Sequence, residues 1–189
     1  MPGYKVEKND FPVLPSDSYF LDLVWIQKLE GAKGPYYRWH WVLAEVASQM
    51  ELIKQFGKCP VSSQTPVVPT LGNRFGHFID VLIGKVAEND EGSTEAIVAR
   101  KFRVKAFVEH NKKNVDGAER VYCNVEKLIV GTAKEGEGIG YKGVPEYLKE
   151  EVNEVLAKAG KPLLEIKEKD KEVAGGKKGE PVKKTDIPW

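Results

Sequence analysis

The sequence is poor in cysteine, lacks any long apolar run and carries almost no net charge. Its 189 residues include only two cysteines, Cys59 and Cys123, which form no CxxC pair; this excludes a disulfide framework and favours a reduced, interior compartment. No segment approaches the roughly 18 consecutive apolar residues that span a bilayer. The polar residues 1–10 lack the apolar stretch of a signal peptide.

Catalytic and metal-binding signatures are also missing. The sequence contains no nucleophile elbow, no phosphate-binding GxxxxGK[ST] and no HExxH. The three histidines, His40, His77 and His110, are far apart and have no second ligand at metal-binding spacing. The sequence therefore predicts a protein that is not an enzyme and that holds no metal and no cofactor.

The overall charge neither favours nor excludes a polyanionic ligand. The formal net charge is +1, so any case for nucleic-acid binding depends on where the cations lie. The hydrophobic fraction of 41% is enough for one domain with its own core.

The first half of the chain has the pattern of strands. Residues 18–30 and 36–46 alternate apolar and polar side chains with a period of two, which predicts a β-hairpin. Residues 47–56 fit either a helix that ends at Gly57 or an irregular connection. We favour the connection, which leads into a short third strand over residues 58–65.

The second half predicts helices followed by two more strands. Thr70 or Asn73 is suited to cap a helix ending near Gly84, and a shorter helix is expected over 93–100. The apolar side of the first helix consists of Phe75, Phe78, Ile79, Leu82 and Ile83. Strands are then expected over 101–109 and 119–130. The polar loop 110–118, with an Asp116-Gly117 turn, is expected to join them.

Five strands with a helix between the third and fourth predict a mainly β fold, a five-stranded OB-fold-like barrel with a C-terminal helix and a disordered tail. The barrel domain is expected to occupy residues 1–132, and a Gly-rich linker residues 133–143. Residues 144–160 read as the C-terminal helix. Residues 161–189, rich in Lys, Glu, Gly and Pro, are expected to be disordered, with a partner-binding tip.

Cations and aromatic rings share alternate positions on several of these strands. If the last two strands pair, Arg103, Lys105 and Phe107 should come close to Arg120 and Tyr122 on one side. Lysines and arginines neutralise phosphates, and rings stack on bases, each stacked base contributing roughly 1–3 kcal/mol. The candidate DNA-binding residues are Tyr36, Arg38, His40, Arg103, Lys105, Phe107, Lys112, Lys113, Arg120 and Tyr122.

Simpler interpretations exist for these residues. Charged alternate positions also occur on any half-solvated strand. Trp25, Trp39 and Trp41 suit a carbohydrate platform, but they share their face with leucines, which favours core packing. The two cysteines are expected to be small buried hydrophobes.

The strand region resembles a phage-type family of OB-fold proteins that coat single-stranded DNA. The resemblance lies in Leu14-Pro15 with Tyr19-Phe20-Leu21, in Tyr37-Arg38-Trp39, in the passage from Thr65-Pro66 to Leu82, and in the hairpin from Phe102 to Asn124-Val125. It implies non-catalytic, largely sequence-independent binding of single-stranded DNA in replication, recombination or repair. The expected location is the cytoplasm of a bacterial cell or phage-infected host.

The last residues, Asp186, Ile187, Pro188 and Trp189, resemble the tip of bacterial single-stranded DNA-binding proteins, which ends in Asp-Ile-Pro-Phe. That resemblance implies recruitment of replication or repair proteins through the tip. Lys183 and Lys184 stand where that family carries acidic residues, and Trp189 replaces the phenylalanine. Two other classes stay open: a protein-interaction or virion-assembly β-domain, and a glycan-binding β-domain. A homo-oligomer is compatible with each.

Overall fold

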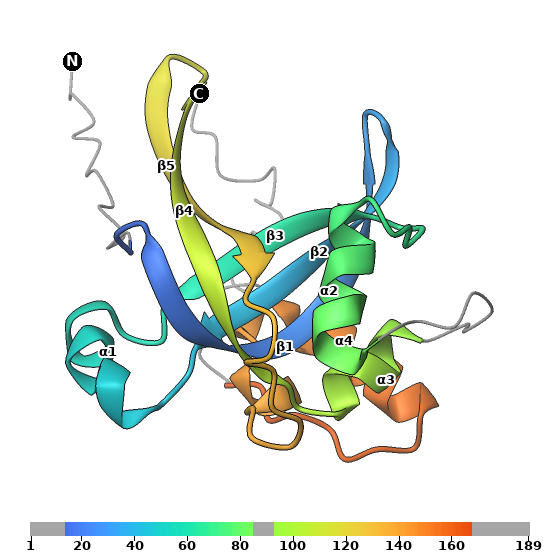
Figure 1. Ribbon diagram of the computed structural model, residues 1–189. Coiled ribbons are helices and arrows are strands. Elements are labelled where there is room, and N and C mark those ends of the chain that lie inside the picture. The colour runs from blue at the N-terminus through green and yellow to red at the C-terminus, as the bar shows by residue number, and fades with distance from the viewer. Residues whose placement is uncertain (1–13, 85–92, 168–189) are drawn as a thin grey trace, which may run out of the picture. The chain divides into compact units, whose positions relative to one another are not determined.

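The computed structural model describes residues 14–84 and 93–167 (Figure 1). The chain divides into two compact units, Met1–Val144 and Pro145–Trp189, which are taken in turn. No helix within the described residues is long and apolar enough to cross a membrane.

The first unit is built on a closed five-stranded barrel. Its strands are β1 (Asp17–Gly31), β2 (Gly34–Leu43), β3 (Pro60–Pro66), β4 (Arg103–Val115) and β5 (Ala118–Leu128). Their order around the barrel is β1-β2-β3-β5-β4. All neighbours are antiparallel except β3 and β5, which are parallel and share one registered pair, Ser62 with Asn124. The mainly β fold is confirmed, and the barrel is compatible with an OB-fold.

The inner side of the barrel is the core, as the alternation predicted. Trp39 and Trp41 are fully buried, and Phe78 packs against both rings at 5.1 and 6.0 Å between centroids. The indole nitrogens of Trp39 and Trp41 donate to the inward-facing hydroxyls of Thr65 and Ser63 at 3.0 and 3.3 Å. The polar side chains of β3 therefore provide the hydrogen-bond acceptors that the buried indoles need. The core-packing prediction is confirmed for Trp39 and Trp41. Trp25 is also buried, but the irregularity after Leu23 pairs it with the outward-facing His40, and Tyr141 packs on its ring. The glycan-binding alternative therefore has no exposed tryptophan among the described residues.

The helices between β3 and β4 follow their predicted caps. Helix α2 (Arg74–Ile83) begins after Asn73, whose side chain accepts a hydrogen bond from the Gly76 backbone N–H. Helix α3 (Thr94–Ala99) begins after Ser93, whose hydroxyl accepts from Ala96 in the same way. The predicted apolar side of α2 is buried except for Ile83, which is 39% exposed.

The connection between β2 and β3 is helical, so the irregular connection that we favoured is wrong. A 3-10 turn (Ala47–Gln49) leads into α1 (Met50–Phe56), which ends at Gly57 as the helix alternative predicted. No residue of α1 is buried, which explains why apolar spacing did not reveal it.

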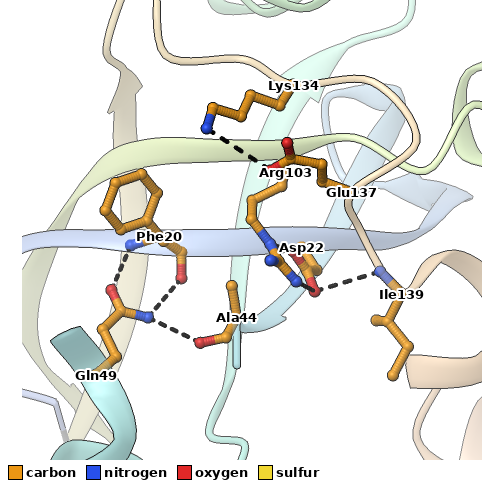
Figure 2. Close-up of polar contacts among 8 residues, drawn as sticks. All are labelled: Phe20, Asp22, Ala44, Gln49, Arg103, Lys134, Glu137 and Ile139. Carbon is orange, nitrogen blue, oxygen red and sulfur yellow. Dashed lines mark hydrogen bonds and ion pairs between the residues drawn. The ribbon is translucent and has the colours of Figure 1, made fainter. Parts of the chain in front are cut away.

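The buried side chain of Gln49 holds this connection to the barrel (Figure 2). Its amide nitrogen donates to the carbonyl oxygens of Phe20 and Ala44 at 3.0 and 3.1 Å, and its oxygen accepts from the Phe20 N–H at 2.6 Å. One side-chain amide therefore bonds backbone groups of both Phe20 in β1 and Ala44 directly after β2.

The segment expected as the polar loop 110–118 is instead a continuation of β4 and β5. The two strands pair as far as Val115 and Ala118, and Asp116 and Gly117 form the predicted turn with φ of 52° and 78°. Most of this extension is polar on both faces because it projects beyond the barrel (Figure 1). It therefore lacks the alternation by which a half-buried strand is recognised.

The segment predicted as a linker, 133–143, is part of the barrel unit. The backbones of Lys134 and Arg103 exchange hydrogen bonds of 2.7 and 2.9 Å. A Cβ at Gly138 would lie 2.5 Å from the Phe102 carbonyl oxygen, so glycine here permits close packing, not flexibility. Tyr141 packs on Trp25 and donates its hydroxyl to the Glu95 carbonyl at 2.8 Å.

The second unit contains a 3-10 turn (Glu146–Leu148) and α4 (Lys149–Lys158), in agreement with the predicted C-terminal helix. The Asn153 side chain both donates to and accepts from the backbone of Leu164, at 3.0 and 2.7 Å. These bonds hold residues 161–167 against α4, although we expected this stretch to belong to a disordered tail. The remainder of that tail and its tip, residues 168–189, lie outside the described residues.

Candidate functional site

The candidate DNA-binding residues fall in three places. The first group, on the outer side of β4, is Arg103, Lys105 and Phe107. The second, on the outer side of β2, is Tyr36, Arg38 and His40. The third, on the β4–β5 extension, is Lys112, Lys113, Arg120 and Tyr122. The expectation that the first group joins Arg120 and Tyr122 is therefore wrong.

Strand register explains this separation. Tyr122 pairs with Asn111 and Arg120 with Lys113, whereas Phe107 pairs with Lys127 after a bulge. Arg103 lies at the opposite end of β4 from Lys113. At about 3.3 Å of rise per residue, the two positions are roughly 33 Å apart.

Arg103 is occupied by a carboxylate of the protein itself. Its Nε and Nη2 donate to the two carboxylate oxygens of Asp22 at 2.7 and 3.0 Å (Figure 2). Only 4% of the Asp22 side chain and 18% of the Arg103 side chain are exposed. Asp22 also accepts from the Ile139 N–H at 3.2 Å. The hydrogen bond to Asp22 raises the pKa of Arg103, and the pair joins β1, β4 and segment 133–143.

A cavity of about 210 Å³ opens beside this pair, but its charge does not suit a nucleic acid. The charged residues of its lining are three carboxylates and two cations: Asp22, Glu45, Glu137, Lys58 and Arg103. Lys58 is itself paired with Glu45 at 3.0 Å. An anionic ligand would therefore meet a net negative lining.

Lys105 and Phe107 lie on the same outer wall as Arg103. They pair with Phe20 and Ser18 of β1, and the Lys105 ammonium lies 5.7 Å from the Phe20 ring centroid. Both side chains are half-buried. We define Asp22, Arg103, Lys105 and Phe107 as the β1–β4 wall.

The second group includes an adjacent ring and cation. Tyr36 and Arg38 are half-buried on the outer side of β2, and an Arg38 Nη2 lies 3.4 Å from the Tyr36 hydroxyl. A Cβ at Gly31 would lie 3.0 Å from the Tyr36 ring, so this glycine lets the ring rest on the hairpin backbone. Across the sheet, Tyr36 faces Pro66 and Arg38 faces Gln64.

His40 differs from its two neighbours because it is only 6% exposed. One ring nitrogen, Nε2, lies 3.1 Å from the Gln27 side-chain oxygen. Burial, with the nearby charge of Arg38, lowers the pKa of His40 to about 4. The ring is therefore neutral at pH 7 and supplies no positive charge to a phosphate.

The third group lies on the β4–β5 extension. Lys113 and Arg120 occupy directly opposed positions in the register of this extension. Lys112 forms an exposed ion pair with Glu119 at 2.8 Å, which raises the pKa of Lys112. Tyr122 is 39% exposed.

The outer wall of β2 and β3 continues onto β5. Ser62 and Gln64 of β3 face the same side as Arg38, and Ser62 is registered with Asn124, two residues from Tyr122. We call this surface the β2–β3 face; it comprises Tyr36, Arg38, Ser62, Gln64, Asn124 and Tyr122. The sequence interpretation missed Ser62, Gln64 and Asn124, although alternation along residues 60–66 already placed Ser62 and Gln64 opposite the core.

Other groups do not form a competing site. Within residues 14–84 and 93–167, no three His, Cys, Asp or Glu side chains gather as they would around a metal ion. Cys59 and Cys123 are half-buried, and burial raises the pKa of each thiol.

No family model, no curated protein and no solved structure matches this chain. A functional proposal therefore depends on the sequence and on the geometry of the barrel.

The Asp22–Arg103 pair should be essential for stability. Asp22→Asn leaves a largely buried guanidinium without its counter-charge, and we expect a loss of about 3–5 kcal/mol in the free energy of unfolding by urea denaturation. Glu135→Gln is the control, since the Arg100–Glu135 pair is also bidentate but exposed, and it should lower the free energy of unfolding far less. Equal effects of the two substitutions would contradict the structural role of Asp22.

His40 should make stability depend on pH. Its pKa of about 4 lies below the ordinary 6.5, so the unfolded chain binds the additional proton first. The contribution is complete above pH 6.5 and is lost as the pH falls toward 4. His40→Asn should remove up to about 3 kcal/mol of this dependence, measured as the difference in unfolding free energy between pH 7 and 4. If His40→Asn leaves the pH dependence of the unfolding free energy unchanged, the buried neutral state of His40 is wrong.

Proposed function

We propose that this protein binds single-stranded DNA without catalysis and largely without sequence preference, across the β2–β3 face. The observation that carries the proposal is the pairing of Tyr36 with Arg38 on the outer wall of a closed barrel with OB-type strand order. An unpaired base offers a flat π-face to a ring, and the neighbouring guanidinium meets the phosphate.

The distribution of charge along the chain supports a polyanionic ligand. The sequence has 28 acidic residues, but none between Glu51 and Asp80, a stretch that contains all of β3. β3 contributes Ser62 and Gln64 to the β2–β3 face. A phosphate backbone running along it therefore meets no acidic residue from that part of the chain.

Two hairpins extend the face. In Figure 1 the β1–β2 hairpin and the β4–β5 extension both rise beyond the barrel on the upper side of the view. The register sets Lys113 opposite Arg120 on the β4–β5 extension. We assign this extension a role in holding the sugar-phosphate backbone.

The roles within the original candidate set change accordingly. Arg38, Lys113 and Arg120 meet phosphates, and Tyr36 and Tyr122 stack on bases. His40 and Arg103 support the barrel, and Lys105 and Phe107 belong to the β1–β4 wall. We propose a role in DNA replication, recombination or repair, as the resemblance to single-stranded DNA-binding proteins implies.

Fluorescence anisotropy with a labelled oligo-dT tests this assignment. Tyr36→Ala should weaken binding by about 1–3 kcal/mol through lost stacking. Arg38→Ala should also weaken it and reduce the slope of log affinity against log salt by about one. Lys105→Ala on the β1–β4 wall is the matched control and should change neither quantity.

Two results would reject the proposal. One is the absence of binding by the unaltered protein at low salt, and the other is a stronger affinity for duplex than for single-stranded DNA. A loss caused by Lys105→Ala but not by Arg38→Ala would move the site to the β1–β4 wall.

We also propose that residues 186–189 recruit a replication or repair protein. This part of the proposal depends on the sequence resemblance alone. Deleting the four residues should leave oligo-dT affinity unchanged, because the phosphate and base contacts are assigned to the barrel. The same deletion should abolish retention of a replication enzyme on the immobilised protein. A large loss of DNA affinity would contradict this division of roles.

A further inference from the structure

The loop of residues 67–73, between β3 and α2, holds two apolar side chains in solvent. Leu71 is fully exposed, at 105%, and Val68 is 63% exposed. Isolated exposed leucines are common, and a flexible loop lets such a side chain fold back onto the surface. This loop has no such freedom, because a side chain of the loop itself holds its backbone through hydrogen bonds.

Asn73 provides the fixation. Its Oδ1 accepts from the backbone N–H groups of Thr70 and Gly76 at 3.2 and 2.9 Å, and its Nδ2 donates to the Val68 carbonyl at 2.8 Å. A Cβ at Gly76 would lie 1.9 Å from the Thr70 carbonyl oxygen, so the loop rests directly on the first turn of α2. The exposure of Leu71 is therefore built into the fold.

The loop begins and ends at the β2–β3 face. Pro66, directly before the loop, pairs with Tyr36, and Arg74, directly after it, donates to the Gln64 carbonyl at 3.5 Å. With about 3.5 Å per extended residue, Leu71 lies within roughly 10 Å of the end of the loop. In Figure 1 the loop between β3 and α2 lies beside the β1–β2 hairpin.

We propose that Leu71, with Val68 behind it, is an apolar wedge that packs against a base of the bound strand next to the base stacked on Tyr36. This inference rests on the proposed function. The faces of an unpaired base are apolar, and leucine wedges contact bases in other nucleic-acid complexes. The loop lies within the acid-free stretch between Glu51 and Asp80. Arg74 directly follows the loop, and Arg38 pairs with Gln64, two residues before Pro66, so these two cations provide charges for the adjoining phosphates.

The test uses the full chain and oligo-dT strands that carry a single 2-aminopurine at successive positions. Leu71→Ala should lower affinity about three- to twentyfold by removing apolar contact. It should leave the salt slope unchanged, because no charge is lost. The fluorescence of one 2-aminopurine position should rise relative to the unaltered complex. Val130→Ala is the matched control, since Val130 is 75% exposed on the loop after β5, and it should have no effect.

The outcomes separate this inference from the function on which it rests. If the unaltered protein does not bind the oligonucleotides, the proposed function falls and the wedge with it. If it binds, and Leu71→Ala behaves like Val130→Ala, only the wedge is overturned. If Leu71→Ala leaves affinity intact but abolishes self-association in sedimentation, the loop contacts a second copy of the chain and the wedge is likewise overturned.

Discussion

The carboxylate of Asp22 is the point on which the closed barrel depends. It accepts two hydrogen bonds from Arg103 and one from Ile139, residues 81 and 117 positions away in the chain. A carboxylate that is only 4% exposed must be neutralised where it lies, so these three segments are held together. β1 pairs with β4 over residues 17–22 and with β2 over residues 21–31, so Asp22 lies where the two ladders overlap.

Alternation along the strands predicted which side chains form the core, but not which exposed residues are neighbours. Val104 and Trp39 are buried as expected, because burial on one side of a strand imposes a period of two. The prediction that Arg103 lies near Tyr122 was wrong because it depends on the register between β4 and β5. The Asp116-Gly117 turn sets that register, yet using it requires knowing that residues 110–115 are a strand. Their polarity on both faces makes them indistinguishable from a loop in the sequence.

A side chain that points away from the barrel core is not always exposed to solvent. His40 faces away from the core as predicted, yet it is buried, and its β1 neighbour Trp25 is covered by Tyr141. Tyr141 belongs to the segment whose glycines suggested a linker. Glycine serves both flexible chains and tight packing, and only the position of the Phe102 carbonyl beside Gly138 distinguishes the two. A segment that covers the outer side of a strand, as residues 133–143 cover β1 at Trp25, does not change the alternation of apolar and polar residues in that strand.

The parallel seam between β3 and β5 has a consequence for how the chain reaches this fold. Ser62 and Asn124 form its one registered pair, whereas every other neighbouring pair of strands shares a longer ladder. The two hairpins assemble from residues close in sequence, whereas the β1–β4 ladder and the seam both join distant parts of the chain. Of these two, the seam has far less strand pairing to offset the lost chain entropy. Non-local contacts of this kind form slowly because the chain entropy is lost before the contact is gained. The ring is therefore expected to close last during folding, after α2, linked to the end of β5 through His77 and the Leu128 carbonyl, has brought the two edges together.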